Sequence, residues 1–239
     1  MKITKHATGL LLTTLLLISG ITAHAGAGQK FPLPPGSKVG HSVLAAMLEA
    51  SKTDCYYQIQ SKSSEVRFSV DSIAGTAKGK FVHFKGGIAL QPEAANNGQV
   101  VFVIKSDSIS TSNIAIDKVV SSKSYMDVER YPEILFVSSG FSWQSDTRGL
   151  LKGKLTLHGV TKPVAFSVEL SGIKRNEPGS SETILVKIAT SISRSKFGMK
   201  LMSKVVNDRV ELSMTIRAKK QSSISKNQLV AISSYSGFR

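Results

Sequence analysis

Apolar and polar residues alternate in several stretches of the chain, and the clearest stretch is 154–170, KLTLHGVTKPVAFSVEL. Leu155 and Leu157 alternate with polar neighbours before the run GVTKP interrupts them. The alternation resumes at Val164 and continues to Leu170. Successive side chains of a β-strand point to opposite faces. The pattern therefore predicts two antiparallel strands with one apolar and one polar face.

The same alternation recurs along the chain and predicts about eight strands. They are expected over residues 65–71, 76–90, 99–104, 134–142, 149–158, 164–173, 183–192 and 206–218. Most links between them have the length of a turn, which indicates an antiparallel sandwich or a closed barrel. Closure removes the exposed edges that eight open strands would leave. We therefore predict an all-β fold, an eight-stranded antiparallel barrel.

Two of these segments carry a further expectation. The segment 76–90 contains Gly86-Gly87, and we expect a single strand that bends at this glycine pair. The segment 99–104 has the apolar run VVFVI, which is apolar on both faces of the strand. Another part of the protein must therefore cover its outer side.

The long connection between Ser106 and Ile134 predicts a short helix around residues 113–127. Ser112 or Asn113 can cap it, and apolar residues follow at helical spacing. Such a helix would plug one end of the barrel or pack on the strand that is apolar on both faces. An eight-stranded barrel either fills with side chains or holds one small ligand.

Residues 1–25 have the pattern of a secretory signal peptide. A basic start and a short apolar run precede Ala23-His24-Ala25, a cleavage site with small residues. The apolar run is shorter than the roughly 20 residues that span a bilayer, and no later segment has the length and apolarity of a transmembrane helix. We expect export to the periplasm with cleavage after Ala25. A cut after Ala27 and a retained amphipathic anchor are the alternatives.

The remaining chain divides into an arm, one domain and a tail. Residues 26–52 begin with a Pro/Gly-rich stretch and continue with apolar residues at helical spacing, so we expect an extended arm with a short helix. Residues 55–219 contain all the strand patterns and no internal linker. Residues 220–239 are basic and Ser-rich with little periodicity, which predicts a flexible tail.

Charge and cysteine content narrow the range of partners. The chain has 31 Lys and Arg against 16 Asp and Glu, a net charge of +15. Residues 1–25 hold two of these lysines and no acidic residue, so cleavage leaves about +13. The basic residues are scattered, which argues against a nucleic-acid site and favours a solvated face or an acidic envelope partner. Cys55 is the single cysteine; we expect a half-buried thiol, while an intermolecular disulfide in a homodimer stays open.

No pattern in the sequence is typical of catalysis or metal binding. After cleavage the histidines are His41, His83 and His158, and none has metal-ligand spacing with Cys, Asp or Glu. The glycines form no phosphate-binding loop, and neither a serine nor Cys55 has the setting of a nucleophile. We therefore expect no enzyme activity, no catalytic residue, no metal and no cofactor.

Seven motifs, in order, carry a resemblance to a known family. They are VRFSVDSIAG preceded by Tyr57, GKFVHFKGGIAL, SDSISTSN, RYPEILFVSSG, GKLTLHGVTKPVAF, SRSKFGM and VVNDRVELSMTI, between about Cys55 and Lys219. The chain thereby resembles the YceI-like family of periplasmic lipid- and polyisoprenoid-binding proteins. The resemblance implies a lipocalin-like barrel whose apolar interior holds a long isoprenoid or a related amphiphile, without covalent chemistry or a metal.

Apolar strand positions supply the candidate ligand-binding lining. These candidates are Phe68, Phe81, Phe84, Phe102, Phe136, Leu155, Leu157, Phe166, Ile188, Phe197 and Met199. A long chain gains about 0.8 kcal/mol per buried CH₂, so an apolar interior binds it without exact polar contacts. The same positions would equally fill a solid core. In that case we expect an envelope interaction or stress protein that docks an acidic partner through its basic surface or N-terminal arm.

The sequence departs from the family pattern where a ligand head group could bind. Relatives usually carry an Arg-Asp pair and then a basic run after the SDSIS-like loop, whereas this chain has Ile116-Asp117 followed by Val119-Val120-Ser121-Ser122. Lys196 stands where an acidic or small polar residue is common. Lys118 and Lys123 are nearby, and the head-group preference stays open.

Overall fold

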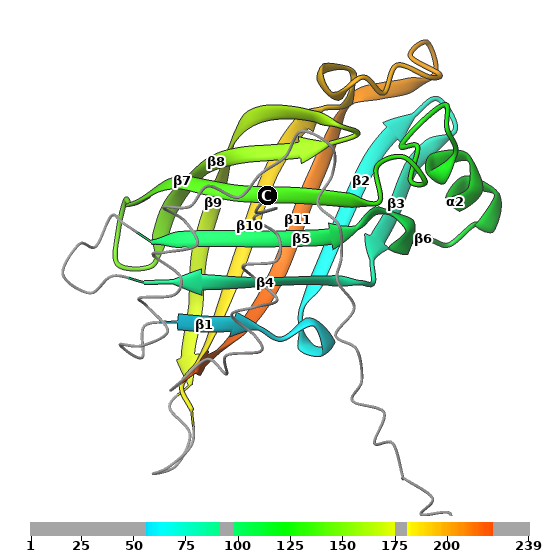
Figure 1. The fold of residues 1–239 in the computed structure, drawn as a ribbon. Helices are drawn as coiled ribbons and strands as arrows, with labels where there is room; N and C mark the ends of the chain where they lie inside the picture. The colour runs from blue at the N-terminus through cyan, green and yellow to red at the C-terminus, as the bar shows by residue number, and fades with distance from the viewer. Residues whose placement is uncertain (1–55, 91–97, 175–180, 222–239) are drawn as a thin grey trace, which may run out of the picture.

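The computed structural model describes residues 56–90, 98–174 and 181–221 (Figure 1). The predicted signal peptide, the arm, Cys55 and the tail beyond Gln221 lie outside the described residues. Among the described residues, no helix has the length and apolar character needed to cross a bilayer.

The described residues form eleven strands, three 3-10 turns and one α-helix. The strands are β1 (Tyr56–Ile59), β2 (Glu65–Ser72), β3 (Gly75–Phe81), β4 (Phe84–Ala89), β5 (Gln99–Lys105), β6 (Ile109–Thr111), β7 (Glu133–Trp143), β8 (Arg148–Leu157), β9 (Val160–Lys174), β10 (Thr183–Ser193) and β11 (Val206–Gln221). The 3-10 turns are η1 (Ser61–Ser63), η2 (Ser106–Ser108) and η3 (Arg194–Phe197), and the helix is α2 (Ile114–Ser121).

Eight of these strands close into an antiparallel barrel, as predicted. Their order is β1-β4-β5-β7-β8-β9-β10-β11, and β11 pairs with β1 to complete the ring. The other three strands, β2, β3 and β6, continue the sheet from β11 beyond the ring. The result is a closed barrel with a three-stranded extension (Figure 1).

The long strand β11 belongs to both parts of the sheet. Near its end Ala218 pairs with Ile59 of β1, and nearer its start Met214 pairs with Val66 of β2. The 3-10 turn η1 separates β1 from β2, so one strand edge of β11 receives two partners in succession.

The expected bend at Gly86-Gly87 is wrong, because the break lies earlier, at Val82 and His83. The backbone N–H of Val82 donates to the carbonyl of Ser108 at 3.1 Å, and the N–H of His83 donates to the Ser108 hydroxyl at 3.1 Å. These bonds to η2 divide the segment into β3 and β4. The glycine pair lies within β4, where a Cβ on Gly87 would collide with the ring of Tyr56.

Buried apolar side chains from all eight ring strands form one core inside the barrel. The rings of Phe136 and Phe166 meet edge to face there at 4.9 Å. A second cluster consists of Val103 and Leu135, which are both buried, and their partly buried neighbours. Phe102 and Ile104 alternate with Val103 and belong to the inner core, so the second cluster lies on the outer face. Val103 and Leu135 are therefore shielded from solvent on the outer face of the sheet. Which segment covers this face stays a prediction.

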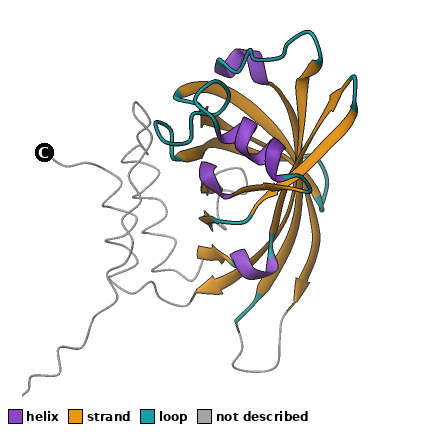
Figure 2. Cartoon of the chain, turned by 90° about the vertical axis from the view of Figure 1, so that its right-hand side faces the viewer, coloured by secondary structure: helices purple, strands orange, loops and turns teal. Residues whose placement is uncertain are grey.

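Helix α2 begins as the sequence predicts and is shorter than expected. The side-chain oxygen of Asn113 accepts a hydrogen bond from the N–H of Ala115 at 2.8 Å, which is the expected N-cap. The helix ends at Ser121 rather than near residue 127. It lies across the end of the barrel that faces the viewer in Figure 2.

Candidate functional site

An apolar cavity of about 720 Å³ occupies the interior of the barrel. Side chains from every strand of the ring and from α2 line it. The lining runs from Trp143 and Ile173 at one end to Ile116 and Met202 at the other, so the cavity extends along the barrel. Because alternate residues of each strand face inward, the strand pattern itself produces this apolar wall.

Nine of the eleven candidate lining residues border this cavity. They are Phe68, Phe81, Phe102, Phe136, Leu155, Leu157, Phe166, Ile188 and Met199. The structure therefore brings together side chains from strands far apart in the sequence. That these residues contact a ligand stays a prediction.

Phe84 and Phe197 do not line the cavity. Phe84 is buried at the start of β4, and its ring packs against Phe102 with 5.5 Å between centroids. Phe197 is buried in η3, where a 3-10 turn rather than a strand sets the direction of its side chain. Both residues belong to the packed core, and their large apolar side chains alone did not distinguish core from cavity wall.

Several lining residues were missing from the predicted set. Ala115, Ile116 and Val119 of α2 face the cavity, and their helical spacing was the signal that could have placed them there. Met202 also lines the cavity, from the connection between η3 and β11. No periodic pattern marks that connection.

One polar pair lies near one end of the cavity. The hydroxyl of Tyr57 donates to the Glu182 carboxylate at 2.5 Å, and both residues line the cavity. This pair puts a hydrogen-bonding group at one end of a mostly apolar wall.

Arg194 borders the opposite end and is fully buried. Its guanidinium donates to the carbonyls of Met199, Leu201, Val206 and Asn207 at 2.7–3.0 Å. Four backbone carbonyls therefore accept hydrogen bonds from the buried guanidinium. These bonds hold the connection 199–205 against the end of the barrel. Arg194 acts on the shape of the wall, because most of its donors are already engaged.

Three of the sequence motifs meet beside η3. His158, in the loop after β8, contacts the carbonyl of Phe197, and the ring of Tyr131 meets the His158 ring edge to face at 4.9 Å. Gly159 has a positive φ of 70°, and a Cβ there would collide with Tyr131. The turn His158-Gly159 therefore joins parts of the structure. The expected interruption of the strands over GVTKP is wrong, because Val160 to Pro163 already belong to β9 and pair with Lys154 to Leu157 of β8.

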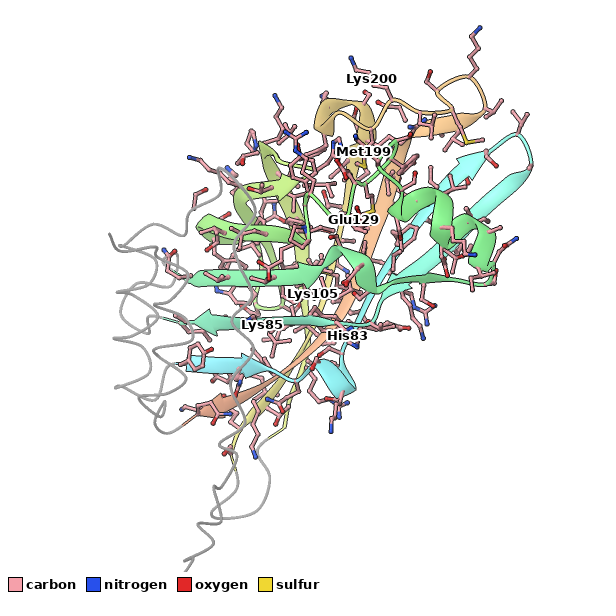
Figure 3. All side chains as sticks on the ribbon, turned by 45° about the vertical axis from the view of Figure 1, so that its right-hand side comes forward. His83, Lys85, Lys105, Glu129, Met199 and Lys200 are labelled. Carbon is pink, nitrogen blue, oxygen red and sulfur yellow. The ribbon has the colours of Figure 1, made fainter. Side chains whose placement is uncertain are left out.

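An ionisable cluster lies on the outer face of the barrel, away from the cavity lining. Glu133 is fully buried, and burial raises the pKa of its carboxyl to about 7, although Lys105 and Lys85 lower it. Burial also lowers the pKa of Lys85. Figure 3 labels both lysines. In the described part of the chain, no group of three His, Cys, Asp or Glu side chains is arranged to hold a metal ion.

Comparison with curated proteins places the chain among bacterial relatives. The UPF0312 protein of Pseudomonas putida strain W619 is 30% identical over 122 residues, which cover 51% of this chain and 63% of that protein. The UPF0312 protein of Pseudomonas fluorescens strain SBW25 is 27% identical over 158 residues, 66% of this chain and 79% of that protein. The chain thus spans less than two thirds of the first of these relatives.

Solved structures share the fold. BcnA of Burkholderia cenocepacia has a TM-score of 0.59 at 22% identity, covering 66% of this chain and 98% of that chain. A polyisoprenoid-binding domain from Saccharophagus degradans, implicated in plant cell wall breakdown, has a TM-score of 0.52 at 14% identity, covering 70% and 98%. At these identities the likeness shows the fold alone.

The family model of the YceI-like domain matches residues 57–218, more than half of the chain. This range begins in β1 and ends in β11, so it includes part of every ring strand and all the residues that line the cavity. The chain belongs to the YceI-like domain family.

Proposed function

We propose that this protein is a non-catalytic binding or carrier protein that holds a long-chain isoprenoid or a related lipid-like amphiphile inside its barrel. The apolar cavity of about 720 Å³ is the observation that carries this proposal. Ligand sites in proteins typically measure roughly 300–1,000 Å³ and are lined mostly by apolar side chains. A flexible chain of methylene and methyl groups fills an elongated apolar space of this kind and gains affinity from each group that leaves water.

The composition of the cavity wall supports binding without chemistry. Its ionisable carboxylate and guanidinium groups, Glu182 and Arg194, lie at opposite ends. The first accepts a hydrogen bond from Tyr57, and the second is bound to backbone carbonyls. An acid/base pair or an activated nucleophile needs groups within hydrogen-bond reach of one reacting atom. This wall favours a ligand that is held rather than converted.

The fold comparison supports the same ligand class. The structural neighbour from Saccharophagus degradans is described as a polyisoprenoid-binding domain. The alternative function, docking of an acidic partner, assumed a solid barrel interior. A cavity of this size is at odds with that assumption, so the interior ligand is the better-supported function.

We also propose that the protein acts in the periplasm, on the basis of the signal-peptide pattern of residues 1–25. Expression of the full chain with a C-terminal tag, followed by fractionation, tests this directly. The expected mature protein is periplasmic and begins at Gly26. An uncleaved protein that stays with the membrane would contradict the proposal.

Native mass spectrometry tests the ligand. Protein purified from its own cell envelope without denaturation should carry an added mass that is lost after unfolding and that partitions into organic solvent. Delipidated protein should take up a fluorescent prenyl or polyene probe with saturable binding. Spectra that stay empty over repeated preparations, together with no uptake of either probe, would overturn the proposed function.

A further inference from the structure

Two large apolar side chains stand exposed at the end of the barrel near α2. Ile73, in the turn between β2 and β3, is 83% exposed, and Ile114, the first residue of α2, is 74% exposed. Neither residue lines the cavity. The proposed interior ligand therefore does not explain why these two isoleucine side chains are exposed to water.

The elements that carry these residues lie at the same end of the molecule. The N–H of Ile73 donates to the carbonyl of Val205 at 3.0 Å, which ties the β2–β3 turn to the connection before β11. The N–H of Thr111 donates to the Asp117 carboxylate at 2.8 Å, which ties β6 to α2, and β6 pairs with β3. Figure 1 shows the turn, the connection and α2 together at the upper right. We call residues 73–74, 114–121 and 199–205 the mouth surface.

The cavity reaches the protein surface within the mouth surface. Ile116 and Val119 of α2 and Met202 of the connection line the cavity and are also exposed. Leu201 beside them is exposed as well. An apolar rim thus surrounds this end of the cavity, and exposed apolar patches of this kind mark sites of interaction with a membrane or a partner.

The charges of the mouth surface are mainly positive. Its charged residues are Lys118, Lys200, Lys204 and Asp117, and the three lysines are exposed. Lys200 projects outward from the connection in Figure 3. The Asp117 carboxylate accepts the hydrogen bond from Thr111 and is tied to the protein. Lys123, also exposed, follows directly after α2.

We propose that the mouth surface docks on an anionic lipid bilayer. Ile73 and Ile114 insert at the level of the lipid headgroups, while the lysines lie against lipid phosphates. The end of the cavity at α2 then opens onto the bilayer. The biological role of this docking rests on the proposed function. A long-chain isoprenoid resides in a bilayer, and from there it would pass into the barrel without crossing water.

Co-sedimentation with vesicles tests the docking. The vesicles contain phosphatidylcholine with about 30% phosphatidylglycerol and no isoprenoid, because anionic lipid sets the attractive surface potential. We expect binding at low salt, weaker binding as salt rises, and little binding to pure phosphatidylcholine. The double variant Ile73→Ser and Ile114→Ser should bind roughly tenfold more weakly. The triple variant Lys118→Gln, Lys200→Gln and Lys204→Gln should lose the preference for phosphatidylglycerol.

Ile173 offers a matched control. It is 52% exposed and lines the opposite end of the cavity. Ile173→Ser removes the same amount of apolar side chain as either single replacement, Ile73→Ser or Ile114→Ser, and should leave vesicle binding unchanged. An equal loss with Ile173→Ser, or no binding of the parent protein to anionic vesicles, would overturn the inference. The inference would also be overturned if the mouth surface bound a partner protein but no vesicles.

The docking and the interior ligand can fail separately. A variant with a blocked cavity, Met214→Trp, should still bind vesicles, since Met214 lies inside the barrel wall away from the mouth surface. Vesicle binding without uptake of any prenyl probe would leave the docking standing and remove the proposed function. Uptake of a prenyl probe from detergent, without binding of the protein to vesicles, would support the proposed function and overturn the docking. Circular dichroism of each variant checks that the fold is retained.

Discussion

The Nδ1 atom of His158 lies 3.0 Å from the carbonyl oxygen of Phe197, and this hydrogen bond joins the loop after β8 to η3. A carbonyl oxygen only accepts, so the imidazole donates from Nδ1. The same 3-10 turn begins with Arg194, which folds the connection 199–205. The loop containing His158 therefore helps to position one end of the cavity, although it contains no residue of the cavity wall.

His158→Ala is expected to destabilise the protein by about 1–3 kcal/mol, because it removes the hydrogen bond to Phe197 and places alanine at a backbone position with φ of 51°. Urea unfolding measures the loss. His158→Asn separates the two causes, since asparagine tolerates positive φ more readily than alanine does. The asparagine variant should be the more stable of the two, and equal stability of both variants and the parent would contradict this role.

Arg194→Lys should cost about 2–5 kcal/mol, because an ammonium group cannot replace a guanidinium that donates to four carbonyls. We also expect faster proteolysis within residues 199–205. Arg209→Lys is the matched control: Arg209 is exposed, and its replacement should change the unfolding free energy by no more than about 0.5 kcal/mol. If both variants behave alike, Arg194 does not hold the connection.

Met214→Trp is expected to reduce uptake of a prenyl probe roughly tenfold or more, because the indole would occupy space that the ligand needs. Thr215, the next residue of β11, is exposed on the opposite face. Thr215→Trp adds a comparable ring outside the barrel and should leave uptake unchanged. Fluorescence titration and native mass spectrometry measure both variants, and an equal loss in the two would place the binding site outside the cavity.

Glu133 should make the protein less stable as pH rises from about 4.5 to 7. Its pKa is about 7 in the folded protein against an ordinary value of 4.5. The unfolded chain therefore loses the proton first, so the folded state loses stability across this window and the effect levels off above it. Glu133→Gln stays uncharged and should remove this dependence, which makes the variant more stable at pH 8 by no more than about 3 kcal/mol.

Urea midpoints at pH 4, 6 and 8 test the prediction for Glu133. Glu129, which Figure 3 labels, is exposed, so Glu129→Gln serves as the control and should keep the pH dependence of the parent. The same slope of stability against pH in both variants would show that the Glu133 carboxyl is not the group responsible.

The long strands could be predicted because their alternation extends over many residues. Val210, Leu212, Met214 and Ile216 alternate with polar residues, and all lie in β11 with the inner face that the pattern indicated. The short strands β1 and β6 were not among the predicted strands, since four and three residues carry too little pattern.

The break between β3 and β4 and the part of the cavity wall formed by the connection 199–205 depend on contacts that the strand pattern does not show. The division of β3 from β4 arises from hydrogen bonds of Val82 and His83 to Ser108, about 25 residues away. Met202 lines the cavity because Arg194 binds the carbonyl of the neighbouring Leu201. Neither relation has a signal in the local alternation, because the Ser108 hydroxyl and the Arg194 guanidinium meet their partners only once the chain has folded.

The pairing of β1 with β11 also sets the order in which the protein can assemble. Tyr56 lies opposite Gln221, so the ring closes between the first and the last described strands. A chain synthesised only as far as Lys200 already contains seven of the eight ring strands but has no closed cavity. Such distant pairing is slow to form. The cavity is therefore among the last features to appear, and a newly made chain cannot enclose a ligand of the proposed kind before β11 is in place.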